Sequence, residues 1–168
     1  DDSGAIALAG VMGGLTTEID EESTDVVLEA AHFRAPLVAA TSRRHKLSSE
    51  ASRRFERGMD SDLALAASNR AAVLFAELGG ATIGGLVDID RREPIPDIQL
   101  DMDLPSRIVG VDISRETVGS ILRRIGCVVA EGAVKPPSWR PDLRAPIDLV
   151  GEVARVVGYG TIPSRGPA

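Results

Sequence analysis

The sequence predicts an α+β fold divided into two domains. Apolar residues recur at helical spacing in some segments and form short continuous runs, typical of strands, in others. These patterns do not alternate regularly, which argues against a parallel βαβ sheet. Residues 91–97 carry two prolines among charged residues, and such a segment can continue neither a helix nor a central strand. We therefore expect domains at about residues 1–93 and 94–168.

Strands are expected near the start of the first domain. The apolar runs 5–11 and 26–31 predict two short strands, and Gly13 with Gly14 predicts a turn after the first. Glu29 interrupts the second run. Its carboxylate either faces solvent by strand alternation or lines a pocket, where it would need a hydrogen-bond donor.

Two helices are expected next. Pro36 fits the first turn of a helix that reaches about Lys46. A longer helix is predicted over residues 61–78, capped by the polar residues 60–62 and stopped by the glycine pair 79–80. The residues expected on one face of this helix are Leu63, Ala67, Ala71, Leu74 and Leu78.

The second domain is expected to contain two amphipathic helices. Ser114 caps the first, which ends at Gly126 and is followed by a strand over residues 127–129. The second begins near Asp148 and ends at Gly158. The apolar positions are Val118, Ile121, Leu122 and Ile125 in the first helix, and Leu149, Val153, Val156 and Val157 in the second.

Composition excludes several classes of protein. Aromatic residues make up only 3% of the 168, which argues against a stacking platform for single-stranded nucleic acid. The single cysteine, Cys127, excludes an internal disulfide and a thiolate-rich metal site. No apolar run approaches the roughly 18 residues of a membrane span, so we expect no membrane partner. Familiar phosphate-loop, dinucleotide and zinc-protease motifs are absent.

Charge is distributed unevenly although the net value is only −6. Residues 1–30 hold eight acids and no base, whereas residues 41–57 hold six bases and two acids. A local basic patch can bind phosphate on an acidic protein because salt screens interactions beyond about 8–10 Å. The alternative is a solvated helix face. The bases are Arg43, Arg44, Lys46, Arg53, Arg54 and Arg57.

Two further sets of residues have chemical potential. Asp142, Asp148 and Glu152 could supply oxygen ligands to Mg²⁺, or Asp148 could cap a helix while Glu152 is solvated. His32 and His45 are isolated, and single histidines in such settings are more often structural or solvated than catalytic.

Seven short motifs occur in a fixed order over nearly the whole chain. They are AGVMGG at 9–14, VLEAA at 27–31, SRRHKL at 42–47, ASRRFERG at 51–58, PSWRPD at 137–142, DLV at 148–150 and GYGTIP at 158–163. In order and spacing they resemble the β subunit of bacterial phenylalanyl-tRNA synthetase. Residues 1–93 resemble the C-terminal half of the B3/B4 editing domain, and residues 94–168 resemble the winged-helix-like B5 domain.

The resemblance implies part of a cytoplasmic α₂β₂ enzyme that esterifies tRNA(Phe) with phenylalanine, using ATP and Mg²⁺. In the family the aminoacylation site lies on the α subunit, so this chain is not expected to bind ATP. Further partners implied are the α subunit and tRNA(Phe). We also expect that edges exposed by a missing half-domain could support self-association.

The resemblance further implies a role in hydrolysing tyrosyl-tRNA(Phe). Glu29 would accept a hydrogen bond from the tyrosine hydroxyl, which phenylalanine lacks. Gly13 would let the backbone pass close to the substrate, and Ser49 and Ala51 would shape the pocket. The basic segment 41–57 would contact phosphates at the acceptor end. No general base is evident, and groups from the N-terminal half would be missing, so we expect poor activity from this chain alone.

The family's Mg²⁺ positions map onto Asp142, Asp148, Gly151 and Glu152. Gly151 departs from the usual glutamate, so the resemblance implies a weakened metal site. A non-catalytic module that binds tRNA or the α subunit is the main alternative function. A general nucleic-acid binder is a weaker one, because bases are scarce after Arg124.

Overall fold

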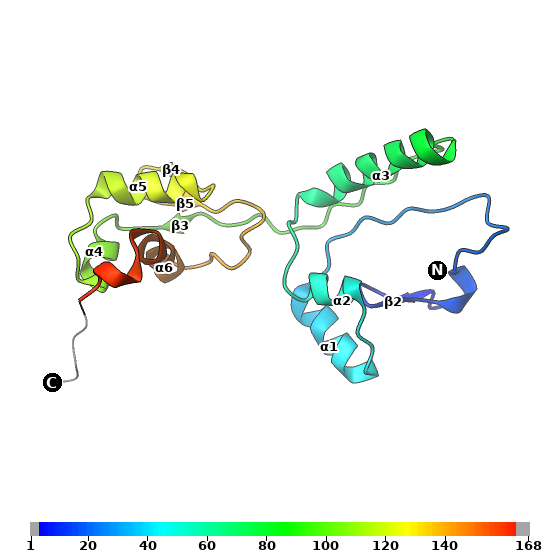
Figure 1. The fold of residues 1–168 in the computed structure, drawn as a ribbon, viewed down its shortest axis with the longest axis horizontal. Coiled ribbons are helices and arrows are strands. Elements are labelled where there is room, and N and C mark those ends of the chain that lie inside the picture. Colours follow the sequence, from blue (N-terminus) through cyan, green and yellow to red (C-terminus); the bar gives the residue numbers. More distant parts are fainter. Residues whose placement is uncertain (1–3, 164–168) are drawn as a thin grey trace. The chain divides into compact units, whose positions relative to one another are not determined.

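The computed structural model describes residues 4–163 and confirms the α+β class. It divides into two compact units, which are described separately: unit 1 extends to Arg92 and unit 2 begins at Glu93. Both units mix helices with a small antiparallel sheet (Figure 1). Within the described residues, no helix combines the length and apolar character needed to cross a membrane.

Unit 1 begins with a minimal hairpin. β1 (Ala7–Leu8) pairs antiparallel with β2 (Met12–Gly13). The chain reverses at Gly10, whose φ is +69°, and a Cβ there would lie 2.9 Å from the Phe33 ring. The predicted turn at residues 13–14 is therefore wrong. Gly10 meets both requirements of the reversal, a left-handed backbone and a close approach.

The predicted strand over residues 26–31 is also wrong. A short 3₁₀ helix, η1 (Leu15–Thr17), is followed by an extended segment that pairs with no strand in the described part of the chain. Val27 is 98% exposed. An apolar run becomes a strand only where a partner edge accepts its backbone hydrogen bonds, and the two-residue hairpin offers none to this segment.

Three helices follow in unit 1: α1 (Ala35–His45), α2 (Glu50–Phe55) and α3 (Leu63–Gly79). The helices predicted over 36–46 and 61–78 are confirmed, whereas the short α2 was not predicted. α3 ends at Gly80, which adopts the left-handed conformation at φ +64°, as predicted from the glycine pair 79–80. Of the residues predicted to cap α3, Asp62 makes no capping hydrogen bond, whereas the Asp60 carboxylate accepts from the Asp62 amide at 2.9 Å.

The apolar core of unit 1 is small. Val11 and Val38 are buried, and the Phe33 and Phe55 rings meet edge to face at 4.9 Å. By contrast, α3 contributes no buried side chain, and Leu78 on its expected apolar face is 82% exposed. Few apolar contacts therefore hold unit 1 together, and its polar contacts carry more of its organisation.

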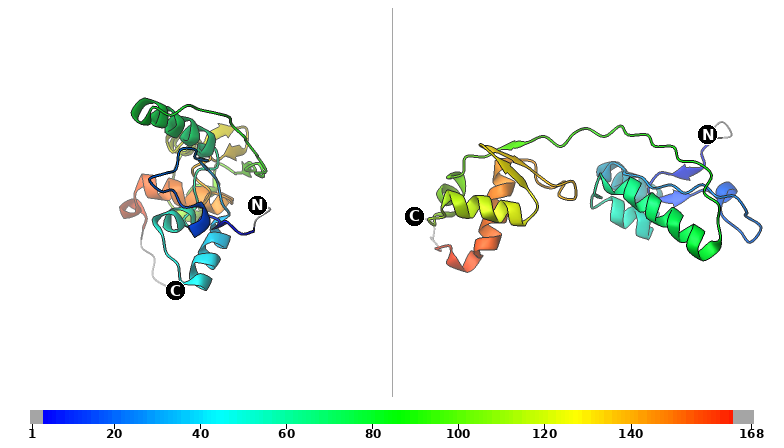
Figure 2. Two further views of the ribbon diagram at one scale, coloured as in Figure 1. Left: turned by 90° about the vertical axis from the view of Figure 1, so that its right-hand side faces the viewer. Right: turned by 90° about the horizontal axis from the view of Figure 1, so that it is seen from above.

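Unit 2 combines a three-stranded sheet with three α-helices. Its strands run in the order β3-β5-β4, and every pairing is antiparallel. The β4–β5 hairpin lies beside α5, and α6 contacts both α4 and α5 (Figures 1 and 2). The elements are β3 (Ile98–Gln99), α4 (Leu104–Val109), α5 (Arg115–Arg124), β4 (Val128–Ala130), β5 (Ala133–Lys135), α6 (Pro146–Val157) and the 3₁₀ helix η2 (Tyr159–Thr161).

The sequence patterns of α5 and α6 are confirmed in this unit. The Ser114 hydroxyl caps α5 by accepting from the Thr117 amide, and α6 is followed by Gly158. α4, β3 and β5 were not predicted, because each is too short to show a clear period. The buried core comprises Ile98, Leu100, Ile113, Val118, Ile121, Leu122, Cys127, Val134, Leu143, Leu149 and Val153.

Two substitutions in α6 test where the core lies. Leu149→Ala removes a fully buried side chain, and we expect it to lower the free energy of unfolding of unit 2 by about 2–5 kcal/mol. Ile147→Ala changes a residue two positions away that is 55% exposed, and should stay within roughly 0.5 kcal/mol of the parent. Urea unfolding followed by the fluorescence of Trp139, the only tryptophan, measures both. Equal effects would contradict this placement of the core.

Candidate functional site

Ser49 joins the start of α2 to the hairpin of unit 1. Its hydroxyl donates a hydrogen bond of 2.6 Å to the carbonyl oxygen of Val11. The Ser49 hydroxyl oxygen also accepts from the Ser52 amide at 3.0 Å, and the Ser52 hydroxyl accepts from the Ser49 amide at 2.9 Å, which completes a capping box. Ser52 is only 1% exposed. These bonds fix the first turn of α2 against the residue that precedes β2.

The structure brings three of the four predicted pocket residues to one region. Ser49 contacts Val11, Gly13 lies two residues further along the hairpin, and Ala51 lies in the first turn of α2. Glu29 is not brought into this contact network. It is exposed in the extended segment after η1, and within the described residues its carboxylate has no hydrogen bond or ion pair. The role of Ser52 was not predicted from the sequence, although a serine three residues after Ser49 has the spacing of a capping box.

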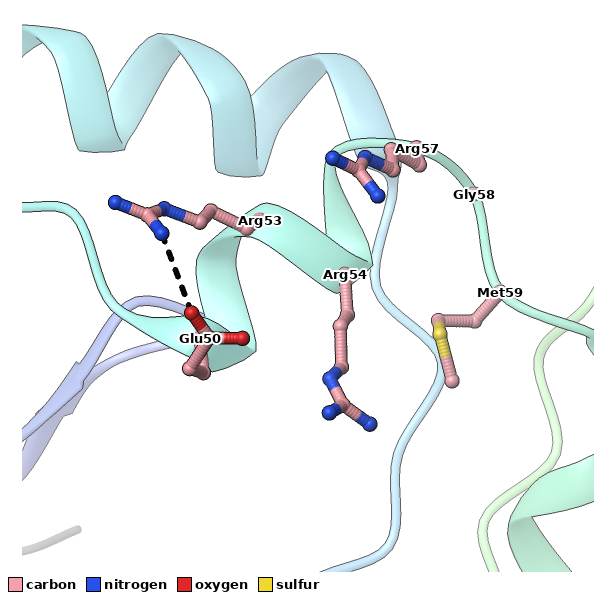
Figure 3. Close-up of a pocket in the computed structure, with 6 residues that line it drawn as sticks. All are labelled: Glu50, Arg53, Arg54, Arg57, Gly58 and Met59. Carbon is pink, nitrogen blue, oxygen red and sulfur yellow. Dashed lines mark hydrogen bonds and ion pairs between the residues drawn. The ribbon is translucent and has the colours of Figure 1, made fainter.

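The basic side chains of α2 border an open hollow of about 580 Å³, lined by Glu50, Arg53, Arg54, Arg57, Gly58 and Met59 (Figure 3). Arg53 donates to the Glu50 carboxylate at 3.2 Å and to the Ser48 hydroxyl at 3.3 Å. In Figure 3, Arg54 points away from this pair, on the side of Met59. Within the described residues Arg54 and Arg57 have no carboxylate partner, so both guanidinium groups are available to an anion.

Three further bases gather at the end of α1. Arg43 and Arg44 lie in its last turn, and Lys46 follows as its C-cap with φ +54°. All three side chains are exposed. Cations at a helix C-terminus are stabilised by the helix dipole, so this placement serves the helix whether or not a ligand is bound.

In unit 2, Arg140 links two of the predicted metal ligands. Its guanidinium donates to both carboxylate oxygens of Asp142, at 2.8 and 2.6 Å, and to Glu152 of α6 at 3.2 Å. A second guanidinium nitrogen forms an ion pair with the other Glu152 oxygen at 3.1 Å. Arg155 donates to Glu152 at 2.5 Å. This role of Arg140 was not predicted, although an arginine two residues before an aspartate is a visible signal in the sequence.

The other two predicted metal positions, Asp148 and Gly151, lie in the first two turns of α6. Asp148 accepts from the backbone amides of Arg144 and Ala145 at 2.9 and 2.8 Å, which is a capping role. Gly151 has open space where a Cβ would lie. Across residues 4–163, no three histidine, cysteine or carboxylate side chains lie together in a group that could hold a metal ion. The donor set as folded does not fit Mg²⁺.

These ion pairs shift the titration of the groups involved. The Arg140 guanidinium lowers the pKa of Asp142, and Arg155 followed by Arg140 lowers the pKa of Glu152. The same pairs raise the pKa of Arg140. Burial raises the pKa of the Cys127 thiol, which makes a thiolate there unfavourable.

Comparisons with known proteins match both units. The B3/4 domain model matches residues 1–80, and the tRNA synthetase B5 domain model matches residues 98–159. A phenylalanine-tRNA ligase beta subunit from Thermobifida fusca is 56% identical over 99% of this chain. Those from Nocardia farcinica and Cutibacterium acnes are 47% and 48% identical, each over 99% of the chain. The chain belongs to the phenylalanine-tRNA ligase beta-subunit family.

The expected resemblance is thereby confirmed, since phenylalanyl-tRNA synthetase is another name for this ligase. The chain spans only about a fifth of the ligase beta subunits it matches, with 21%, 22% and 20% of their lengths covered in the three relatives above. Its unit 1 contains the B3/4 match and its unit 2 contains the B5 match.

Substituting Ser49 tests the link between α2 and the hairpin. Ser49→Ala removes the N-cap and the bond to Val11, and should destabilise α2 by about 0.5–2 kcal/mol. Hydrogen exchange of the Ser52 amide should speed up accordingly. Ser49→Thr keeps the hydroxyl and should exchange like the parent, as should Ser48→Ala at the exposed neighbour. Unchanged protection in Ser49→Ala would show that the bond does not hold α2.

Proposed function

We propose that this chain is the part of a phenylalanine-tRNA ligase beta subunit that joins the editing domain to the B5 domain. Residues 1–93 would belong to the C-terminal half of the B3/B4 domain, and residues 94–168 would form B5. The domain models end at residue 80 and resume at residue 98, so the proline-containing segment 91–97 falls between them. The division of the structure at residues 92 and 93 is compatible with this assignment.

The whole enzyme, in this proposal, charges tRNA(Phe) with phenylalanine in the cytoplasm, using ATP and Mg²⁺. The α subunit would carry the aminoacylation site, and the partners of this chain would be the α subunit and tRNA(Phe). The support is the identity of 45–56% over nearly the whole chain to proteins that carry this ligase's name. No step of aminoacylation is assigned to residues of this chain.

Within the enzyme, unit 1 would contribute to the hydrolysis of tyrosyl-tRNA(Phe). The observation that carries this proposal is the 2.6 Å bond from the Ser49 hydroxyl to the Val11 carbonyl, which holds α2 against the hairpin. Gly13 has open space where a Cβ would lie, so a substrate could approach its backbone there. Ala51, small and exposed in the first turn of α2, would border the same space.

Glu29 would read the tyrosine hydroxyl by accepting its hydrogen bond. Its carboxylate is unpartnered within residues 4–163, so no internal donor competes for it. A site built around such an acceptor discriminates against the substrate without a hydroxyl, because the acceptor is then left unpaired once water is excluded. Excluding water from the exposed Glu29 requires a covering surface. We therefore expect efficient hydrolysis only in a longer chain or the assembled enzyme.

A second candidate is a module that binds tRNA without chemistry. The observation favouring it is that Arg54 and Arg57 border one hollow and have no carboxylate partner within the described residues. Guanidinium groups recognise phosphate through paired N–H donors. This role is compatible with editing, since the same contacts would place the acceptor end of tRNA near the hairpin.

Glu29→Ala in the full-length enzyme tests the editing role. Clearance of tyrosyl-tRNA(Phe) should fall at least tenfold, because the tyrosine hydroxyl loses its hydrogen-bond acceptor. Charging with phenylalanine should stay unchanged, because Glu29 takes no part in it. Glu22→Ala, an exposed acid in the same acidic region, is the control and should edit normally. If the Glu29→Ala enzyme still clears tyrosyl-tRNA(Phe) at the parent rate, Glu29 does not read the hydroxyl.

Replacing Arg54 and Arg57 tests the binding role in this chain itself. The double alanine variant should bind tRNA(Phe) more weakly, and the salt dependence of log K should flatten by about 1 for each lost phosphate contact. Arg123 and Arg124 are exposed arginines in unit 2, and their double alanine variant gives the same change in net charge. Equal losses in both double variants would indicate a diffuse charge effect and remove the assigned contact.

A further inference from the structure

Arg140 links the segment between β5 and α6 to α6 itself. This segment, residues 136–145, contains the core residue Leu143, whose amide donates to the Arg140 carbonyl at 3.2 Å. The Arg140 side chain then reaches Asp142 within the segment and Glu152 in the second turn of α6. One guanidinium therefore ties a loop that supplies a core residue to the helix that packs over it.

The exposure of the three groups shows which contact matters most. Glu152 is 14% exposed and Arg140 is 22% exposed, whereas Asp142 is 59% exposed. A mostly buried carboxylate must be paired, because leaving it alone in a poorly solvated site is costly. Arg140 and Arg155 together surround Glu152 with two guanidinium groups. Two cations then face two carboxylates, and the cluster carries no excess negative charge to attract a divalent cation.

The other oxygen donors nearby are already engaged. One oxygen of Asp148 accepts two backbone amides at the start of α6, where its loss would leave both donors unpaired. At Gly151 there is no side chain to supply a ligand. A metal ion at this place would have to displace an arginine from Asp142 and Glu152 and compete with a helix cap at Asp148.

We propose that the Arg140 guanidinium takes the structural place of a metal ion in unit 2, so that the unit folds and remains folded without a divalent metal. The carboxylates of Asp142 and Glu152 are then bridged by this guanidinium, and Asp148 is a helix cap. Unit 2 would behave in this way whether or not unit 1 takes part in editing or tRNA binding.

The experiment measures thermal unfolding of the whole chain by Trp139 fluorescence, in 1 mM EDTA and in 10 mM MgCl₂. The parent midpoint should be the same in both solutions. Arg140→Gln leaves Glu152 with Arg155 alone and should lower the midpoint by roughly 4–8 °C. Arg124→Gln is the matched control, since Arg124 is exposed in the same unit and has no partner within the described residues. Its midpoint should stay at the parent value.

Isothermal titration of MgCl₂ into the parent gives an independent readout. We expect no saturable binding heat at Mg²⁺ concentrations up to 1 mM. A parent midpoint that rises with Mg²⁺ or falls with EDTA would overturn the proposal, and so would saturable binding. Equal midpoints for Arg140→Gln and Arg124→Gln would also overturn it. If Arg140→Gln does not fold, Asp142→Asn and Glu152→Gln are compared instead. Asp142→Asn keeps the Arg140–Glu152 pair, so its unfolding midpoint should fall by less than half as much as that of Glu152→Gln. Equal decreases would overturn the proposal.

Discussion

The burial of apolar side chains against α6 is the constraint on which the second half of the structure depends. Leu149 and Val153 are fully buried one turn apart, and they cover residues from α5 and from the sheet. Because α6 meets both α4 and α5, its position fixes the other two helices. The loop that leads into α6 must then pack over the core. This requirement explains why Leu143 is buried and why Arg140 pairs both with Asp142 in the loop and with Glu152 in α6.

Unit 1 is organised on a different physical basis. Its apolar core is small, so hydrogen bonds and close backbone approach decide how the hairpin meets the helices. Gly10 lets the hairpin turn against Phe33, and Ser49 fastens the next residue, Val11, to the start of α2. Such contacts are short-ranged and specific, but each contributes only about 1 kcal/mol. They position a surface accurately without making the unit strongly stable, which suits a surface completed by further contacts.

Sequence patterns predicted the parts that follow from local chemistry. The caps and apolar periods of α5 and α6 were correct because a repeated period and a terminal serine or glycine act within a few residues. The strand at 26–31 failed because pairing is a property of two segments, and the apolar run carries no information about its partner. For the candidate site, Ser49 and Gly13 were placed together only by the fold. Its assignment to editing rests on the family resemblance and was not deducible from residue chemistry.

The two arginine groups of this chain illustrate how context decides the role of a charge. Arg140 has Asp142 two residues away and Glu152 on the facing helix, so its donors are consumed within the fold. Arg54 and Arg57 line an open hollow whose one lining carboxylate, Glu50, is taken by Arg53. Counting bases along the sequence treats these arginines alike. The fold separates them, because a guanidinium that pairs internally adds rigidity, whereas one without a partner retains the donors that an external phosphate needs.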